Sequence, residues 1–178
     1  LFMKLAHLSG KTIAIMVANG FDETSFIAIQ RAVTEAGAEL KIVSREAGLT
    51  NAWNGNGWGM SYLADATLST TLAIDYDGLI VPTGKRHIDT LEHDAHAKRV
   101  LRAFLREDMP VLLQGDAYAM LQFVDGAADR AHATANSIDG APYVDGRLVT
   151  NAVARNDLAE LEAFAEAVGS VADESCAA

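Results

Sequence analysis

The sequence predicts an α/β fold built around a mainly parallel β-sheet. Short apolar runs rich in β-branched residues alternate with segments whose apolar residues recur at helical spacing, which is the pattern of strand–helix units. The runs are continuously apolar, as expected for strands buried on both faces of a parallel sheet. No repeat, low-complexity tract or long linker divides the 178 residues, so we expect one domain.

The first strand–helix unit is expected near the start of the chain. Residues 12–17 form an apolar, β-branched run that Asn19 and Gly20 close. A helix should follow and end at Gly37, a residue type that often terminates helices. Its apolar stripe consists of Phe26, Ile29, Val33 and Ala36.

The middle of the sequence predicts two further strands and a hairpin. Residues 40–43 form the second strand, and residues 78–82 form the next strand of the sheet. Between them, asparagine–glycine steps in residues 51–59 are typical of a hairpin turn and do not suit a phosphate-binding loop.

A helix over residues 95–107 packs on the sheet and ends before Pro110. The inner face of this helix is formed by Val100, Leu101, Phe104 and Leu105. A buried strand over residues 111–114 then runs directly into Gly115 and Asp116, which precede a short helix over residues 117–123.

The C-terminal part adds a strand over residues 148–150 and a final helix. The apolar stripe of that helix consists of Leu158, Leu161, Phe164, Ala165 and Val168. We therefore expect a domain over residues 11–172, an N-terminal extension or artificial remnant over residues 1–10, and a flexible tail over residues 173–178. Because the chain starts at Leu1, a native start at Met3 and an origin in a longer protein both remain open.

Composition excludes several classes of function. The chain carries 14 basic and 24 acidic residues, and its net charge of −10 disfavours nucleic acids and acidic membrane surfaces as partners. No apolar run has the roughly 20 residues that span a bilayer, and the N-terminus lacks a signal-peptide core. The single cysteine, Cys176, excludes internal disulfides and indicates a cytoplasmic protein.

Four segments resemble the ThiJ/PfpI superfamily. In chain order they are residues 12–17 with Gly20-Phe21-Asp22, then Ile80-Val81-Pro82-Thr83-Gly84, residues 110–121 and residues 145–150. The resemblance implies a flavodoxin-like three-layer sandwich related to class I glutamine amidotransferases, usually assembled as a homodimer. Members of the superfamily include proteases, amidases, glyoxalases, chaperones and regulators, so the resemblance implies the fold more firmly than the function.

The resemblance places the family's catalytic elbow at residues 114–117. The cysteine nucleophile of the family aligns with Gly115, and its glutamate partner aligns with Ser25, just after Asp22 and Glu23. Glycine suits an elbow because its backbone adopts strained conformations with little penalty. The segment Gln114-Gly115-Asp116-Ala117 is also similar to the C-terminal domain of large-subunit catalases, which lacks the cysteine.

Other positions of the expected pocket are also assigned by the resemblance. Thr83 and Gly84 align with a turn whose backbone amide helps to form an oxyanion hole, so that donor is expected to remain available. His132 lies where the family can supply a triad histidine, but without a cysteine to serve we expect a loop or strand-edge side chain. Thr83, Gly84, Ser25, Gly115, Asp116 and His132 thus define an expected pseudo-active site.

Two roles are open for Asp116. As a helix cap, it accepts hydrogen bonds from the first amides of the helix over residues 117–123, and this is the interpretation we favour. As a general acid or base, it acts together with Asp22 or Glu23. An open cleft with convergent carboxylates favours an enzyme, whereas a pocket filled by side chains favours a relic; the candidate fillers are Tyr118, Phe21 and Met60.

No metal or cofactor site is expected. His87, His93 and His96 lie among the acidic residues Asp89, Glu92 and Asp94, but a third placed ligand is missing, and a charged, solvated helix start explains the cluster. Cys176 lies in the tail, where nothing activates its thiol.

Three functions remain open. The favoured one is a non-catalytic, stress-associated or regulatory module that forms a homodimer and binds a small molecule. The second is a cysteine-independent hydrolase, amidase, lyase or hydratase that uses Asp116 with Asp22 or Glu23. The third is the C-terminal domain of a larger catalase-like protein.

Overall fold

A seven-stranded sheet forms the centre of the computed structural model, which describes residues 2–128, 130, 141–152 and 159–177. The strand order is β6-β3-β1-β7-β8-β10-β9, and every neighbouring pair is parallel except β10 and β9. The strands are β1 (Thr12–Val17), β3 (Glu39–Ser44), β6 (Ala66–Thr67), β7 (Gly78–Val81), β8 (Val111–Gln114), β9 (Tyr143–Asp145) and β10 (Leu148–Asn151). The predicted α/β fold with a mainly parallel sheet is therefore confirmed.

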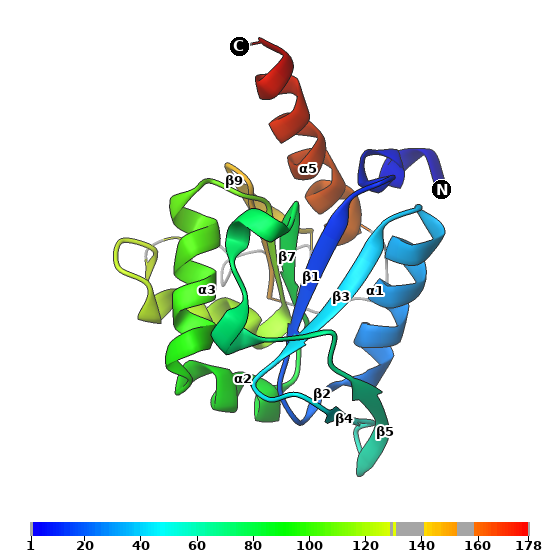
Figure 1. Ribbon diagram of the computed structural model, residues 1–178, viewed down its shortest axis with the longest axis vertical. Helices are drawn as coiled ribbons and strands as arrows, with labels where there is room; N and C mark the ends of the chain where they lie inside the picture. The colour runs from blue at the N-terminus through cyan, green and yellow to red at the C-terminus, as the bar shows by residue number, and fades with distance from the viewer. Residues whose placement is uncertain (1, 129, 131–140, 153–158, 178) are drawn as a thin grey trace.

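Helices cover both faces of the sheet and complete a three-layer sandwich (Figure 1). One face is covered by η1 (Phe2–Leu8), α1 (Glu23–Glu35) and α5 (Ala159–Ala177). The other face is covered by η2 (Leu68–Thr70), η3 (Ala73–Asp75), α2 (Lys85–Glu92), α3 (Ala95–Arg106) and η4 (Gly115–Phe123). None of the helices in the described part of the chain has the length and apolar character needed to cross a bilayer.

The hydrophobic core has two parts, one on each face of the sheet, and alternate side chains of the buried strands belong to different parts. In β1, Ile13 and Ile15 pack towards α1 and α5, whereas Ala14 and Met16 pack towards α3. Successive side chains of a strand point to opposite faces, so one continuous apolar run supplies both cores.

A small second sheet lies beside the carboxyl edge of the main one. It consists of β2 (Phe21–Asp22), β4 (Leu49–Trp53) and β5 (Trp58–Leu63), in the order β2-β4-β5. β4 and β5 form an antiparallel hairpin, which confirms the hairpin predicted from the asparagine–glycine steps.

Both chain ends differ from the expectation. Leu5 and Leu8 of η1 are buried in the core with Phe164 and Val168 of α5, so these residues belong to the domain and are not an appended extension. α5 continues to Ala177, and the expected tail is therefore helical up to that residue.

Two helices also differ from the expectation. α2 was not predicted from the sequence, because only His87, Ile88 and Leu91 of its eight residues are buried. The short helix after β8 is a 3-10 helix that begins at Gly115 and not at Ala117. This earlier start changes the role of Asp116.

Candidate functional site

A cleft of about 510 Å³ lies at the carboxyl edge of the main sheet. The segments that follow β1, β7 and β8 all contribute to it, because ligand sites of open α/β sheets lie in the crevice outside the carboxyl ends of the strands. Its lining residues are Gly20, Asp22, Trp53, Thr83, Gly84, Lys85, Arg86, Asp89 and Asp116.

The elbow after β8 has the backbone shape that the sequence analysis expected. Gly115 follows Gln114 directly and has a φ of +57°, in the left-handed region. A side chain in this region is strained by about 1–2 kcal/mol, whereas glycine is not. Gly115 thus keeps the sharp turn while offering no nucleophile.

Asp116 binds the start of a different helix from its own. Its Oδ1 accepts a hydrogen bond from Thr83 Oγ1 at 2.8 Å and another from the backbone amide of Gly84 at 2.9 Å. Gly84 is the N-cap residue of α2, and the N-cap of η4 is Gln114, which makes no side-chain cap bond. The prediction that Asp116 caps the helix after it is therefore wrong, because η4 starts two residues earlier than predicted and contains Asp116 in its first turn.

The same contact corrects the expectation for the Thr83–Gly84 turn. The family resemblance implies that the amide of Gly84 remains available as an oxyanion-hole donor. That amide instead donates to the Asp116 carboxylate. A ligand oxygen would have to displace this carboxylate to receive the hydrogen bond.

Two substitutions of Asp116 are expected to show how much its hydrogen bonds and how much its charge contribute to the stability of the protein. Asp116→Ala removes both hydrogen bonds across the turn and should destabilise the protein by about 2 kcal/mol. In Asp116→Asn the amide oxygen can accept the same two bonds, so the loss should be less than half as large. Urea denaturation at pH 7 measures both values; equal losses in the two variants would show that the charge, and not hydrogen-bond geometry, carries the stabilisation.

Asp22 is the N-cap residue of α1. Its Oδ2 accepts a hydrogen bond from the amide of Ser25 at 2.8 Å, and its own amide donates to the carbonyl of Thr83 at 2.9 Å. Asp22 thereby joins the Thr83 turn to the first helix while lining the cleft. Ser25 is buried and does not line the cleft.

Glu23 faces the hairpin instead of the cleft. Its Oε2 accepts a hydrogen bond from the amide of Met60 in β5 at 2.6 Å. Burial and the Glu23 carboxylate together raise the pKa of Tyr62 in the same strand above its ordinary value. The structure therefore brings Asp22 and Asp116 to one cleft but does not bring Glu23 to it.

The rim of the cleft carries residues that the sequence analysis missed. The guanidinium of Arg86 lies 4.1 Å from the centre of the Trp53 ring, in a cation–π contact that joins α2 to the hairpin. Lys85 pairs with Asp89 at 2.9 Å on the solvent side. The sequence does show two cationic residues, Lys85 and Arg86, directly after Gly84. Their place at the rim of the cleft becomes evident only when the helix α2 that carries them is recognised.

The three candidate filler residues lie elsewhere. Phe21 is buried in the core, with its ring centroid 4.9 Å from that of Phe26. Met60 is exposed on the hairpin, and Tyr118 is not among the residues that line the cleft. The cleft is thus not closed by these side chains.

His87 is fully buried, and its interpretation as part of a solvated surface is wrong. Its Nε2 donates to the carbonyl of Pro82 at 2.6 Å, and its Nδ1 accepts from the amide of Ala18 at 3.4 Å, so the neutral ring fits between the ends of β1 and β7. Burial lowers the pKa of His87 to about 4, against weaker opposing effects of the Pro82 hydrogen bond and of the Asp116 and Asp22 charges.

Gln114 is a second buried polar residue that the sequence analysis missed. Its Oε1 accepts from the amide of Thr83 at 3.2 Å, and its Nε2 donates to Glu160 Oε1 at 2.7 Å. Gln114 thus ties β8 to the Thr83 turn on one side and to α5 on the other.

The remaining candidates do not join the cleft. His93 Nδ1 lies 2.8 Å from the carbonyl of Asp89, and the described residues include no group of three or more potential metal ligands. His132 lies outside the described residues. Cys176 belongs to the last turn of α5, which projects from the end of the molecule opposite the carboxyl edge of the sheet (Figure 1).

Comparisons with known proteins agree with this architecture. Residues 11–166 match the model of the DJ-1/PfpI family. An uncharacterized protein of Staphylococcus haemolyticus is 26% identical over 155 residues, which cover 79% of this chain and 88% of that protein. General stress protein 18 of Bacillus subtilis is 28% identical over 102 residues, which cover 57% of this chain and 58% of that protein.

Solved structures share the fold at low sequence identity. Drosophila melanogaster DJ-1beta superposes with a TM-score of 0.71 at 18% identity, over 93% of this chain and 97% of that one. A two-domain protein of Anabaena variabilis, with DJ-1/ThiJ/PfpI-like and ferritin-like domains, gives a TM-score of 0.70 at 20% identity. The match covers 92% of this chain but only 48% of that protein.

Proposed function

Since the chain belongs to the DJ-1/PfpI family, we propose that it is a member that acts by binding a small polar molecule and not by thiol catalysis. The observation that carries this proposal is the contact of Asp116 with Thr83 and Gly84. At the elbow, glycine replaces the family's nucleophile, and a carboxylate occupies the backbone donor that would polarise a substrate.

The hydrogen bonds of the other carboxylates support the same proposal. Asp22 is engaged by the amide of Ser25, and Glu23 is engaged by the amide of Met60. A general acid and base must both be within reach of one reacting atom. Each carboxylate proposed for that task instead accepts hydrogen bonds from a turn, a helix start or the hairpin, so binding is the function that this geometry supports best.

The chemistry of the lining residues indicates the class of ligand. Two cations, Lys85 and Arg86, and three carboxylates surround the open space, with the Trp53 ring on one side. Both signs of charge lie around one small cleft, so we infer a ligand that carries both an amine and a carboxylate, such as a free amino acid or a short peptide.

The proposal also includes a physiological role, a cellular location and an oligomeric state. Similarity to general stress protein 18 supports a role in a stress response, and the single cysteine in the chain supports a cytoplasmic location. A homodimer is supported by exposed apolar side chains on the small second sheet and the first helix; they are Ile27, Leu49, Trp58, Met60 and Leu63.

Titration calorimetry with free amino acids and dipeptides tests the ligand class, with simple amines and simple carboxylates as single-charge controls. We expect ligands with both charges to bind about tenfold more tightly than the controls. Arg86→Ala should remove this preference, whereas Arg31→Ala, which alters an exposed arginine on α1, should preserve it. Each bound compound should be recovered unchanged by NMR. A compound that is converted by the parent protein but not by Asp116→Asn would contradict the non-catalytic proposal.

A further inference from the structure

A second hollow, separate from the cleft, lies between α3 and the segment that contains η2 and η3. We call it the arginine groove. Its volume is about 740 Å³, and it is lined by Leu72, Ala73, Ile74, Arg99, Arg102, Ala103, Arg106, Glu107 and Met109. None of these residues contributes to the cleft at the carboxyl edge of the sheet.

The amphipathic pattern of α3 explains why arginines line one wall. Val100, Leu101 and Phe104 of this helix are buried against the sheet. Arg99, Arg102 and Arg106 follow a spacing of three and four residues, which places them along one side of the helix.

Arg99 fixes the opposite wall. Its Nη2 donates to the carbonyl of Leu68 at 2.8 Å and to the carbonyl of Thr71 at 3.2 Å. These bonds hold the segment that carries Leu72 and Ile74 beside α3. The groove is thus a built feature with a defined width, while Arg102 and Arg106 are exposed to solvent.

The wall that Arg99 holds is apolar and open. Leu72 is 54% exposed and Ile74 is 86% exposed, and Met109 lies at one end of the groove. Covering such aliphatic groups with a ligand chain is favourable by about 0.8 kcal/mol for each buried methylene of the ligand.

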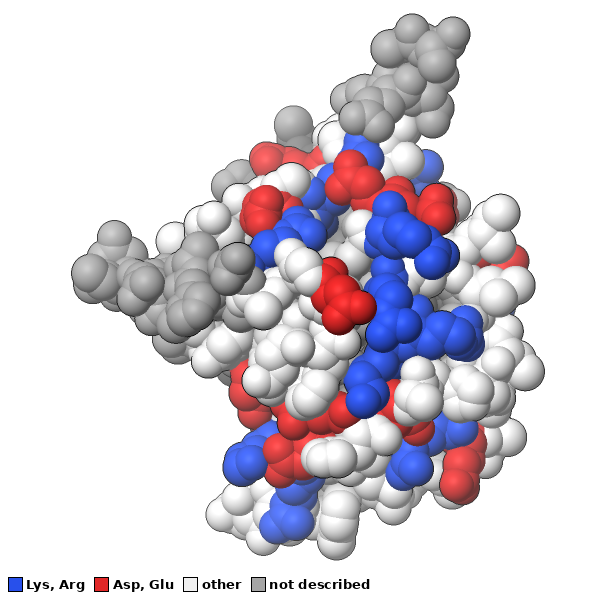
Figure 2. Space-filling model, turned by 90° about the vertical axis from the view of Figure 1, so that its left-hand side faces the viewer, with Lys and Arg blue, Asp and Glu red and all other residues white. Residues whose placement is uncertain are grey.

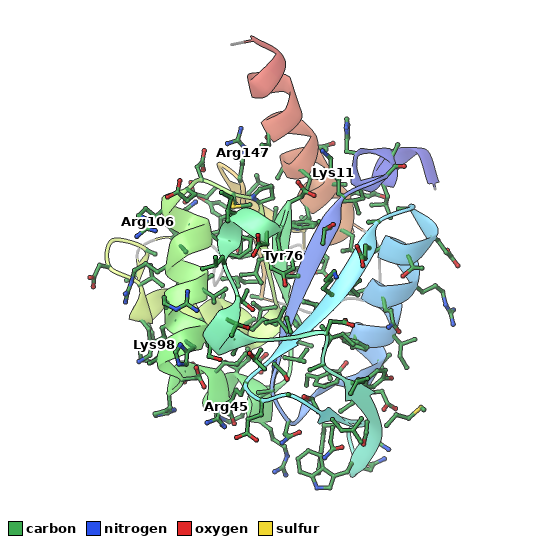
Figure 3. All side chains as sticks on the ribbon, viewed as in Figure 1. Lys11, Arg45, Tyr76, Lys98, Arg106 and Arg147 are labelled. Carbon is green, nitrogen blue, oxygen red and sulfur yellow. The ribbon has the colours of Figure 1, made fainter. Side chains whose placement is uncertain are left out.

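The local charge opposes that of the whole protein. The net charge is −10, yet the groove has three arginines and only one acidic residue, Glu107. Glu107 Oε1 lies 3.5 Å from Arg106 Nε, and both side chains are more than 60% exposed, so this pair is weak. Figure 2 shows Lys and Arg gathered in a band on this side of the molecule, and Figure 3 shows Lys98 and Arg106 projecting from the same helix.

We propose that the arginine groove binds a small anionic amphiphile, namely a single-chain carboxylate. The carboxylate pairs with Arg102 and Arg106, and the alkyl chain lies along Leu72, Ile74 and Met109. The volume is in the range of small-molecule sites, about 300–1,000 Å³. The seven-residue step from Arg99 to Arg106 spans only about 10 Å of helix, which is too short for a protein partner with a standard interface.

Calorimetry with decanoate below its micelle concentration tests the groove, with decyltrimethylammonium as the cationic control and butyrate as the short-chain control. We expect saturable binding of decanoate alone. Amide NMR shifts should fall on residues 72–74 and 99–109. Equal binding of the cation, or shifts confined to the cleft, would overturn the proposal. So would binding to anionic phospholipid vesicles without binding of free decanoate.

Matched variants locate the ligand. Arg102→Glu should weaken decanoate binding about tenfold, and Ile74→Ser should weaken it through loss of apolar contact. Arg31→Glu makes the same charge change on α1, across the sheet from α3. It should leave the affinity within about twofold of the parent, because salt screens exposed charges that lie far apart. All three positions are exposed, so circular dichroism should confirm unchanged folding. If Arg102→Glu and Arg31→Glu weaken decanoate binding equally, the effect is due to the net charge of the protein, and the assignment of the ligand to the groove is overturned.

Discussion

Replacing Gly84 by alanine is expected to destabilise the protein by about 3–5 kcal/mol, through backbone strain and overpacking together. The φ of Gly84 is +140°, which L side chains rarely adopt. A Cβ there would lie 2.9 Å from three backbone atoms, namely Asp22 N, Gly20 O and Phe21 Cα. Backbone atoms cannot rotate away as side chains do, so the turn between β7 and α2 would have to shift.

Alanine variants of two other glycines distinguish the cost of backbone strain from the cost of steric overlap. Gly48 has a φ of +110°, and no atom lies within 4 Å of the position that an alanine methyl group would take. Gly48→Ala should therefore show the strain alone, about 1–2 kcal/mol. Gly57 has open space and no such φ, so Gly57→Ala should change stability by less than about 0.5 kcal/mol. Urea denaturation of all three variants measures these values; a loss in Gly84→Ala no larger than in Gly48→Ala would contradict the packing argument.

His87 should make the protein less stable as the pH falls from 6.5 to 4. The pKa of His87 is about 4 in the folded protein and about 6.5 in the unfolded chain, so in this window the unfolded chain binds the extra proton. The contribution of His87 is therefore fully present above pH 6.5 and declines as the pH falls, by about 3 kcal/mol in total. Denaturation midpoints across the window measure the slope.

Histidine variants test whether this slope belongs to His87. His87→Gln keeps a side-chain donor for the Pro82 carbonyl but does not titrate, so its stability should vary less with pH than that of the parent. His96→Gln changes an exposed histidine at the start of α3 and should keep the parent slope. If His87→Gln retains the full slope, another group must carry the pH dependence.

The sequence was sufficient for the elements whose signals are local. The strand over residues 12–17 and the helix that ends before Gly37 were both predicted, because apolar spacing and glycine stops act within a few residues. The position of Gly115 at the elbow was expected from the family resemblance, and the left-handed backbone found there is one that glycine adopts without strain.

The partners of the polar side chains were not predictable in the same way. Asp116 binds residues more than 30 positions earlier, and His87 bonds the amide of Ala18, 69 positions away. Such contacts depend on how strands are ordered in the sheet, which polar residue types alone do not encode. α2 was missed for a related reason: one of its three inward-facing residues is histidine, so its apolar stripe is too sparse to recognise.

The contact of Asp116 with the Thr83–Gly84 turn also restricts which substitutions the elbow can accept. A cysteine introduced at position 115 alone would adopt a strained backbone beside a negative carboxylate, which disfavours a thiolate. Its neighbouring backbone donor would still be bound to Asp116. Removing Asp116 first would instead leave two polar hydrogens of the turn without that acceptor. Either single substitution lowers stability before it can provide chemistry, so thiol chemistry at this elbow would require both changes together.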